Sequence, residues 1–373
     1  MAARLAVDDF EDELLYLNYL DHDGGERVDV LMDRGDPFEE LSDIKFQERF
    51  RLSKPTVSYL LQQISEHLTY PTNRNHPVSP MNRLLTTLRF YATGAFNILI
   101  GDTANVHKTT VARIIHDVSS IIASYSPRYI SFPTSQAQRR EVMDGFHDIA
   151  QFPGVIGTID CTHIRIKSPG GEYAETFRNR KAYFSINCQT ISDSNLLIRD
   201  IVARWPGSVH DSTIFQNCNK RAQFESGEIE YGYLLGDSGY PCKPYLLTPL
   251  LNPVTPEEQR YNRAHIKTRN TIERQYGVWK RRFPALSLGL RCEVTKALNI
   301  IVATAVLHNI AISTREDNPP DDIEVRRLLE ELQQNRGPDI QDDEPVHPVH
   351  LMYRDDHNAG RAVRQALING HFT

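Results

Sequence analysis

The sequence predicts an α/β protein, and three observations along the chain support that fold class. Apolar residues recur at helical spacing from residue 42 to about residue 129. Short apolar runs bounded by turn residues, which are typical of buried strands, follow after Pro153. Two more segments with helical spacing close the pattern near residue 313. We therefore expect an acidic mobile arm at 1–41, a helical domain at 42–130, an α/β domain at 150–315 and an acidic, Pro-rich tail at 316–373.

Charge is distributed unevenly along the chain, whose formal net charge is -6. Residues 1–44 contain fourteen Asp and Glu against three Arg and Lys, whereas residues 260–291 contain nine Arg and Lys around Glu273. Local charge decides where a polyanion binds, so the acidic average does not exclude a nucleic-acid-binding protein.

Cysteine content and hydropathy exclude two broad classes of protein. The five cysteines (161, 188, 218, 242 and 292) form no CxxC pair, and the N-terminus shows no signal peptide, so we expect a reduced, intracellular protein. No apolar run approaches ~18 residues, so we expect no membrane partner.

The N-terminal part predicts several helices. Ser42 is a candidate N-cap for a helix at 42–51, and Pro55 lies in the first turn of a helix at 53–68. Further helices are expected at 81–93, 97–104 and 107–124, after a Pro/Asn loop at 71–80. The arm carries one apolar patch at 14–20, and the arm is either a docking segment for a partner or a solubilising tail.

Residues 96–115 are similar to a helix-turn-helix, with a short helix, a turn and a longer helix. Lys108 and Arg113 lie near the start of the longer helix, where a recognition helix contacts bases and phosphates. The alternative is a helical packing domain with a polar surface.

The second half predicts a sheet flanked by helices. Strands are expected at 155–160, extended past a turn by 164–166, then at 183–192 and 196–204 as a hairpin, at 231–235, and in short form at 245–250. Helices are expected at 211–224, 268–281 and 293–313, and one short helix within 346–373. This order is that of the ribonuclease H-like fold, in which the first and fourth strands end side by side.

Three acidic residues are candidate site residues in this order of strands and helices. Asp160 and Asp237 each end a short apolar run, and Glu273 lies on a later helix that is dense in Arg and Lys. Carboxylates brought together repel one another unless a cation lies between them, and hard cations such as Mg²⁺ and Mn²⁺ prefer oxygen ligands. We therefore expect Asp160, Asp237 and Glu273 to be catalytic metal ligands. The alternative for each is a helix cap or a surface ion pair.

The helix around Glu273 belongs to a basic segment with interleaved aromatic residues. The predicted DNA contacts in it are Arg269, Arg274, Lys280, Arg281 and Arg282. Lys167, Arg178, Arg180 and Lys181 are candidates for an opposite wall. A solvated helix face is the alternative.

At this point the chain resembles the PIF/Harbinger superfamily of DDE transposases, and within it the Harbinger transposase-derived nucleases, over roughly residues 40–315. The matching blocks are Gly157-Thr-Ile-Asp160-Cys-Thr-His-Ile164, Trp205-Pro-Gly-Ser-Val-His-Asp211-Ser-Thr-Ile-Phe215, Leu235-Gly-Asp237-Ser-Gly-Tyr-Pro241, Ile272-Glu273-Arg-Gln-Tyr-Gly-Val-Trp-Lys280-Arg-Arg-Phe283 and Leu307-His-Asn309. Cys161 stands where many members carry Gly.

The resemblance implies a ribonuclease H-like DDE catalytic core that binds divalent Mg or Mn through Asp160, Asp237 and Glu273. It implies Asp211 as a further metal-binding position, although a helix cap competes with that role. His163 and His210 either orient a phosphate or water or make structural hydrogen bonds.

Three functions remain open at this stage. The first is a metal-dependent DNA endonuclease, with a DNA 3′-hydroxyl replacing water if strand transfer occurs. The second is a catalytically silent DNA- or protein-binding factor, and the third is a ribonuclease. The resemblance implies DNA and a Myb/trihelix-like protein as partners, with the chain in nucleus and cytoplasm. A homodimer is a further partner that the sequence allows.

Overall fold

The computed structural model describes residues 36–69, 77–319, 323, 326, 327, 330 and 354–373. Most of the predicted acidic arm with its apolar patch, most of the Pro/Asn loop and residues 331–353 of the predicted tail lie outside the described residues.

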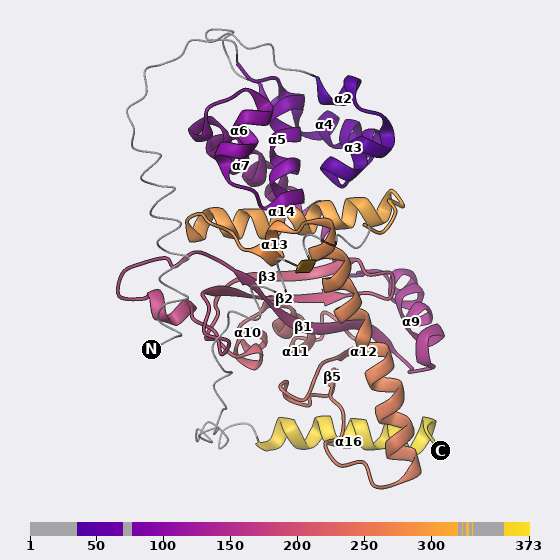
Figure 1. The fold of residues 1–373 in the computed structure, drawn as a ribbon. Helices are drawn as coiled ribbons and strands as arrows, with labels where there is room; N and C mark the ends of the chain where they lie inside the picture. Colours follow the sequence, from indigo (N-terminus) through magenta and orange to yellow (C-terminus); the bar gives the residue numbers. More distant parts are fainter. Residues whose placement is uncertain (1–35, 70–76, 320–322, 324–325, 328–329, 331–353) are drawn as a thin grey trace.

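The N-terminal part is helical, as the sequence predicts (Figure 1). The side chains of Ser53 and Ser79 accept hydrogen bonds from the third residue after each, and a proline follows in the first turn of both helices. Five of the helices begin and end within a residue or two of their predicted bounds, and α2 and α8 add two short ones. The helices are α2 (Pro37–Glu40), α3 (Asp43–Phe50), α4 (Lys54–Leu68), α5 (Pro80–Thr93), α6 (Asn97–Ala104), α7 (Lys108–Ser124) and α8 (Ser126–Tyr129).

A helix that the sequence analysis did not predict, α9 (Gln136–Ala150), precedes the sheet. Ser135 and Gln138 form a capping box at its start, in which each side chain accepts a hydrogen bond from the other residue's backbone N–H. Its Val142 and Phe146 are buried among residues of the sheet and of α12.

Five strands form one mixed sheet in the order β3-β2-β1-β4-β5. The strands are β1 (Val155–Arg165), β2 (Ser185–Ser192), β3 (Ile198–Pro206), β4 (Tyr233–Leu235) and β5 (Leu246–Leu247). β1, β2 and β3 pair antiparallel, while β1 pairs parallel with β4 and β4 with β5. The predicted element order is confirmed, and the first and fourth strands are neighbours, which is consistent with a DDE-type nuclease fold.

Three predicted elements differ from the structure. β1 is a single strand without the expected turn after Asp160, because its residues keep pairing with β2 as far as Arg165 opposite Ser185. The predicted helix at 211–224 is two helices, α10 (Asp211–Gln216) and α11 (Asn219–Glu225), and the Cys218 thiol caps the second of them. A short 3₁₀ helix, η1 (Ala174–Phe177), precedes β2.

The third difference is α12 (Pro256–Arg282), which begins twelve residues before the predicted start at 268. Thr255 and Glu258 form a capping box there, and Pro256 lies in the first turn. Figure 1 shows α12 crossing the face of the sheet from α16 to α14. The helix therefore spans the whole α/β part and carries one long series of side chains past the sheet.

Helix α14 (Val294–Ser313) lies between the N-terminal helices and the sheet, after the short α13 (Ala285–Leu288) (Figure 1). It packs against α7 on one side and β3 on the other. By length and composition alone α14 could cross a membrane, which the sequence analysis did not anticipate, yet 67% of its apolar window is buried inside the protein. That burial is typical of a core helix.

The C-terminal helix α16 (Arg354–His371) is much longer than the short helix predicted within 346–373. Its Ile368 and the following Phe372 are buried beside Tyr261 of α12. Arg260 of α12 donates a 2.7 Å hydrogen bond to the carbonyl of Phe372, and Arg364 donates one of 3.0 Å to the carbonyl of Thr248. The end of the chain thus holds the start of α12.

Arg282 holds the other end of α12. Its side chain is 1% exposed, and its two terminal nitrogens donate hydrogen bonds of 3.1 and 3.0 Å to the carbonyls of Arg51 and Asp317. The guanidinium therefore ties α12 to the N-terminal helices and to the chain that leaves α14.

We expect Arg282→Ala to lower the free energy of unfolding by about 2–4 kcal/mol, because it removes a buried side chain, opens a cavity and leaves two part-buried carbonyls without their donor. The exposed neighbour Arg281→Ala should change it by less than about 0.5 kcal/mol. Urea unfolding of both variants measures the difference. Equal stability of the two variants would contradict the role of Arg282 as a tie between the elements.

Candidate active site

Asp160 lies in the middle of β1, on the face of the sheet that α12 crosses. Its carboxylate Oδ1 accepts a 2.8 Å hydrogen bond from the backbone N–H of Cys161, and Oδ2 accepts one of 3.0 Å from Arg269. The side chain is 13% exposed. Burial, reinforced by the negative charges of Asp237 and Glu273, raises the pKa of Asp160 to about 7 against the lowering effects of the N–H and Arg269.

Asp237 follows β4, the strand beside β1, and its charge is near Asp160. In the parallel pair of β1 and β4, Leu235 lies opposite Thr158, and each acid stands two residues beyond its paired residue. The Asp237 carboxylate accepts a 2.9 Å hydrogen bond from the backbone N–H of Gly239, which forms a tight turn. The sheet register thus brings two carboxylates out side by side.

Glu273 approaches from α12, one turn after Arg269. The Nη1 atom of Arg269 lies 3.4 Å from Oε1 of Glu273 and 3.0 Å from Oδ2 of Asp160. The two oxygens can be no farther apart than the sum of these distances, which is well inside the ~10 Å that a shared metal site allows. Because 55% of the Glu273 side chain is exposed, the site opens to solvent at this carboxylate.

Two backbone contacts fix β1 against α12 at the site. The Tyr276 hydroxyl donates a 2.6 Å hydrogen bond to the carbonyl of Asp160. Lys280, further along α12, donates hydrogen bonds to the Thr162 hydroxyl (2.6 Å) and to the carbonyl of His163 (3.0 Å). These hydrogen bonds between α12 and β1 therefore set the position of Glu273 relative to Asp160.

The donor set fits a hard divalent cation in chemistry and in charge. Asp160, Asp237 and Glu273 offer carboxylate oxygens, and Arg269 compensates only part of their negative charge. Within residues 36–69, 77–319 and 354–373, no three His, Cys, Asp or Glu side chains stand close enough together to hold a metal ion as they lie. Arg269 lies between Asp160 and Glu273 in this arrangement.

Asp211 does not join these three residues in the structure. It lies in the first turn of α10, and its carboxylate accepts a 2.9 Å hydrogen bond from the Asn187 amide. Its charge contributes to the raised pKa of Cys161, which is mainly due to burial. Because side chains alternate along a strand, Cys161 faces away from the side that carries Asp160. The predicted fourth ligand therefore stands on the other face of β1.

The two histidines near the acids differ in environment. His163 exchanges a 3.0 Å hydrogen bond with the Ser185 hydroxyl, and burial lowers the pKa of His163 to about 4. His163 is thus neutral at pH 7 and makes a structural hydrogen bond. His210 precedes α10 and lies 3.3 Å from a guanidinium nitrogen of Arg180.

The structure corrects two of the predicted DNA contacts. Lys280 donates its hydrogen bonds into β1, and burial lowers the pKa of its amine to about 8. Arg282 is buried at the end of α12. Polar partners on neighbouring elements hold both cations inside the protein, so neither side chain is available to a DNA phosphate.

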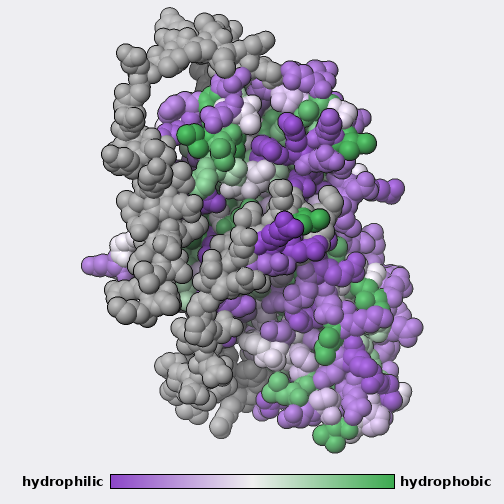
Figure 2. Space-filling view, in the orientation of Figure 1, coloured by the Kyte–Doolittle hydropathy of each residue, from purple (hydrophilic) through white to green (hydrophobic). Residues whose placement is uncertain are grey.

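The remaining basic residues of α12 include an exposed stripe. Lys267, Arg274 and Arg281 are exposed and spaced by seven residues, which places them along one side of the helix beside Glu273. Hydrophilic residues dominate this face of the molecule in Figure 2, and the hydrophobic residues there form only small groups. In the N-terminal part, Arg113 is exposed and Lys108 is half-buried at the start of α7. Of the predicted opposite wall, Arg178 is paired with Glu175 at 2.7 Å.

Sequence reasoning missed the second role of three residues. Arg269 is a predicted DNA contact, and in the structure it also bridges two acids. Tyr276 and Lys280 are polar residues whose partners lie on β1. Tyr276 and Lys280 follow Arg269 by seven and eleven residues, so all three lie near one side of α12. This spacing is a sequence signal that could have indicated a buried polar face.

Comparisons with known proteins give one family model and several relatives for this chain. A family model described as a DDE superfamily endonuclease matches residues 159–309, a range that contains all four acids. The protein named "Putative nuclease HARBI1" is 32% identical to the chain in Rattus norvegicus and 31% in Homo sapiens, each over 317 residues that cover 79% of this chain and 90% of the relative. "Protein ALP1-like" of Arabidopsis thaliana is 25% identical over 298 residues, covering 74% of this chain and 72% of the relative. No solved structure matches the chain significantly.

We expect Asp160→Asn to stabilise the metal-free protein at pH 8. The pKa of Asp160 rises from 3.8 to about 7 on folding, so the wild-type protein loses stability as pH rises through that window, while the amide does not ionise. The gain should be on the order of 1–4 kcal/mol at pH 8 and should shrink toward pH 4. Urea unfolding in EDTA at several pH values measures it.

The exposed Asp144→Asn on α9 controls for the loss of one surface charge. A variant at position 160 that is less stable than the wild type at pH 8 would show that the ionised carboxylate of Asp160 supports the fold.

Proposed function

The chain belongs to the Harbinger transposase-derived nuclease family, and we propose that it is a divalent-metal-dependent endonuclease that hydrolyses phosphodiester bonds in DNA. One observation carries the proposal. Strand β1, the turn after β4 and helix α12 each supply a carboxylate, and two of the three share a single guanidinium nitrogen. A structural ion pair would not need the third acid beside it.

In this proposal Asp160, Asp237 and Glu273 hold the metal ions. Bound Mg²⁺ or Mn²⁺ would activate the attacking water and neutralise charge on the phosphate. Asp160 is positioned for its role by the Cys161 N–H and by the Tyr276 hydroxyl on its own carbonyl. A DNA 3′-hydroxyl in place of water would give strand transfer. Asp211 stays a predicted fourth ligand, which this structure does not bring to the other three.

Arg269 has two roles in the proposed cycle. Before metal binds, its guanidinium offsets the repulsion between Asp160 and Glu273. A dication bound by the carboxylates would supply that compensation, so neither acid would then need the guanidinium. A planar guanidinium binds phosphate oxygens well, so the released Arg269 is suited to hold the substrate phosphate beside the site.

The exposed stripe of Lys267, Arg274 and Arg281 gives the proposed path of the DNA backbone past Glu273. Lys108 and Arg113 on α7 are the proposed base-reading contacts of a helix-turn-helix. A Myb/trihelix-like partner, a homodimer and a location in nucleus and cytoplasm belong to the same proposal.

The bridging Arg269 also supports a second candidate function. A guanidinium that already compensates two carboxylates would suit a catalytically silent DNA- or protein-binding factor that keeps the fold without turnover. Metal-dependent cleavage decides between the two functions.

We expect the purified protein to nick supercoiled plasmid DNA in Mg²⁺ or Mn²⁺ and to be inactive in EDTA. Asp160→Asn and Glu273→Gln should each reduce the nicking rate by roughly 10²-fold or more, because each removes a proposed metal ligand. Glu230→Gln, an exposed acid after α11, serves as the matched control and should keep the wild-type rate. A wild-type protein that never nicks DNA with either metal would support the silent factor instead.

We expect the basic stripe and the α7 residues to affect DNA binding differently. Replacing Lys267, Arg274 and Arg281 together by Gln should weaken binding to two unrelated duplexes equally. It should also reduce the magnitude of the slope of log K against log salt by about 2–3. Each phosphate contact that is lost lowers the number of counterions that DNA releases on binding. Fluorescence anisotropy in EDTA at several salt concentrations measures both effects.

In the same titrations Lys108→Gln with Arg113→Gln should change the ratio of the two affinities, because base contacts carry sequence information. Lys45→Gln with Arg140→Gln removes two exposed charges elsewhere as a control. If the stripe variant keeps the wild-type salt slope, the DNA path does not follow α12.

A further inference from the structure

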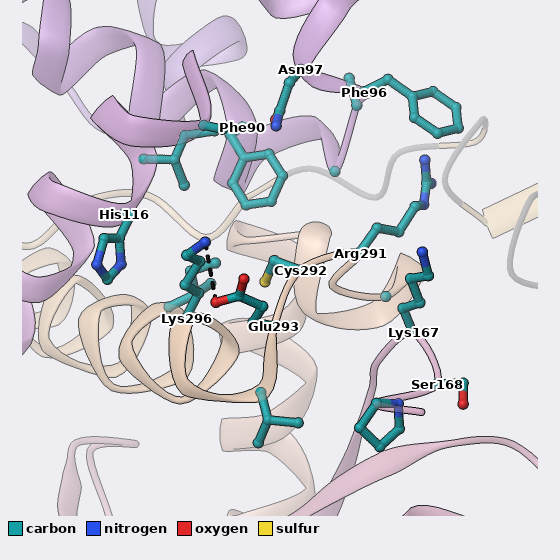
Figure 3. Close-up of a pocket in the computed structure, with 18 residues that line it drawn as sticks. Phe90, Phe96, Asn97, His116, Lys167, Ser168, Arg291, Cys292, Glu293 and Lys296 are labelled. Carbon is teal, nitrogen blue, oxygen red and sulfur yellow. Dashed lines mark ion pairs between the residues drawn. The ribbon is translucent and has the colours of Figure 1, made fainter. Parts of the chain in front are cut away.

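A cavity of about 550 Å³ lies between the N-terminal helices and the catalytic part (Figure 3). Its walls come from the end of α5 and the start of α6, from α7, from the loop after β1, and from the chain between α13 and α14. Lys167 in its wall follows Asp160 by seven residues of mostly extended chain, roughly 20 Å. The cavity is therefore separate from the carboxylate site, and its volume is that of a small-molecule pocket.

The charged side chains of this cavity favour an anionic ligand. Lys167 and Arg291 extend toward the same part of the cavity in Figure 3, and the Arg291 guanidinium lies 4.0 Å from the centre of the Phe96 ring. The acidic side chain in the wall, Glu293, is paired with Lys296 at 3.2 Å. Three basic residues against one acidic residue leave a net positive wall, which suits a phosphate group.

The remaining walls offer groups that suit a nucleobase. The Phe90 ring faces the middle of the cavity, and the Asn97 side chain points into it from the same helical wall, near Phe90 (Figure 3). Within the described part of the chain, the buried Nδ1 atom of His116 has no hydrogen-bond partner. An aromatic face stacks on a base, while an amide and an imidazole can bond to its edge.

We propose that this cavity binds one unpaired nucleotide of a DNA strand. Its phosphate lies between Lys167 and Arg291, its base stacks on Phe90, and Asn97 and His116 bond to the base edge. The inference rests on the proposed DNA endonuclease function, because a nucleotide drawn out of the duplex here would fix the strand relative to the distant cleavage site. An acidic peptide would also satisfy the basic wall, but it would have no need of an aromatic face with two edge-reading groups.

The test uses the full chain in EDTA and two labelled seven-nucleotide DNA strands. One strand consists of abasic sites throughout, and the other carries a single adenine at its centre. Both strands have the same phosphates, so the difference in their affinities isolates the contribution of the base. We expect the strand with adenine to bind about tenfold more tightly by fluorescence anisotropy, since one stacked base contributes that much.

Variants locate the effect. His116→Ala and Asn97→Ala should each reduce the preference for the adenine strand, because each removes a bond to the base edge, whereas Lys167→Gln should weaken both strands alike. Lys45→Gln, an exposed lysine on α3, is the matched control and should leave both affinities unchanged. Replacing the single adenine by 5-iododeoxyuridine and irradiating the complex should give a crosslink to Phe90 or Phe96.

Equal binding of the two strands, or a crosslink that maps outside the cavity, would overturn the proposal. Tight binding of a synthetic acidic peptide that is lost in Lys167→Gln, with no preference between the strands, would overturn it in favour of a peptide site. Plasmid nicking by the same protein is scored separately. Nicking without base preference rejects only this inference, and base preference without nicking rejects only the proposed catalytic function.

Discussion

Carboxylates repel one another when a fold brings them together, and in this protein the guanidinium of Arg269 offsets that repulsion at the site. It lies within hydrogen-bonding distance of Asp160 on a strand and of Glu273 on a helix. Even with that compensation the pKa of Asp160 stays near 7, because burial and two neighbouring negative charges outweigh one guanidinium. The arrangement therefore holds the acids in place, but their negative charge is only partly compensated.

That arrangement depends on helix α12 being held along its whole length. Its start is bonded through Arg260 to Phe372, the residue after the C-terminal helix. Its middle is bonded to β1 through Tyr276 and Lys280, and its end to the N-terminal helices through Arg282. Glu273 thus approaches β1 from a helix with little freedom to shift. Residues of the N-terminal helices and of the sheet share one hydrophobic core around α14, so the helical part also supports the site.

The acids could be predicted from the sequence, and their surroundings could not. Apolar runs that end at Asp160 and Asp237 indicate strand ends, which is right for Asp237 after β4, whereas β1 continues past Asp160 as far as Arg165. The sheet register nevertheless places the two acids side by side on neighbouring strands. Composition cannot separate Lys280, which is bonded into β1, from the exposed Arg281 next to it, because both lie in one basic run. The partners that bury such cations are hydroxyls and carbonyls distant in sequence. Thr255 and Glu258 form a capping box that indicates the early start of α12 in the sequence. The prediction instead placed the start at residue 268, where the dense Arg and Lys residues begin.

On the proposed function, Asp160, Asp237 and Glu273 together hold divalent metal in place of the Arg269 guanidinium. Anomalous diffraction from crystals grown with Mn²⁺ tests this exchange, since it locates the ion independently of activity. We expect a manganese peak within coordination distance of carboxylate oxygens from all three residues, with Arg269 withdrawn from Asp160. A fully ordered site in which Arg269 still bridges Asp160 and Glu273, with no manganese peak beside them at saturating Mn²⁺, would contradict it.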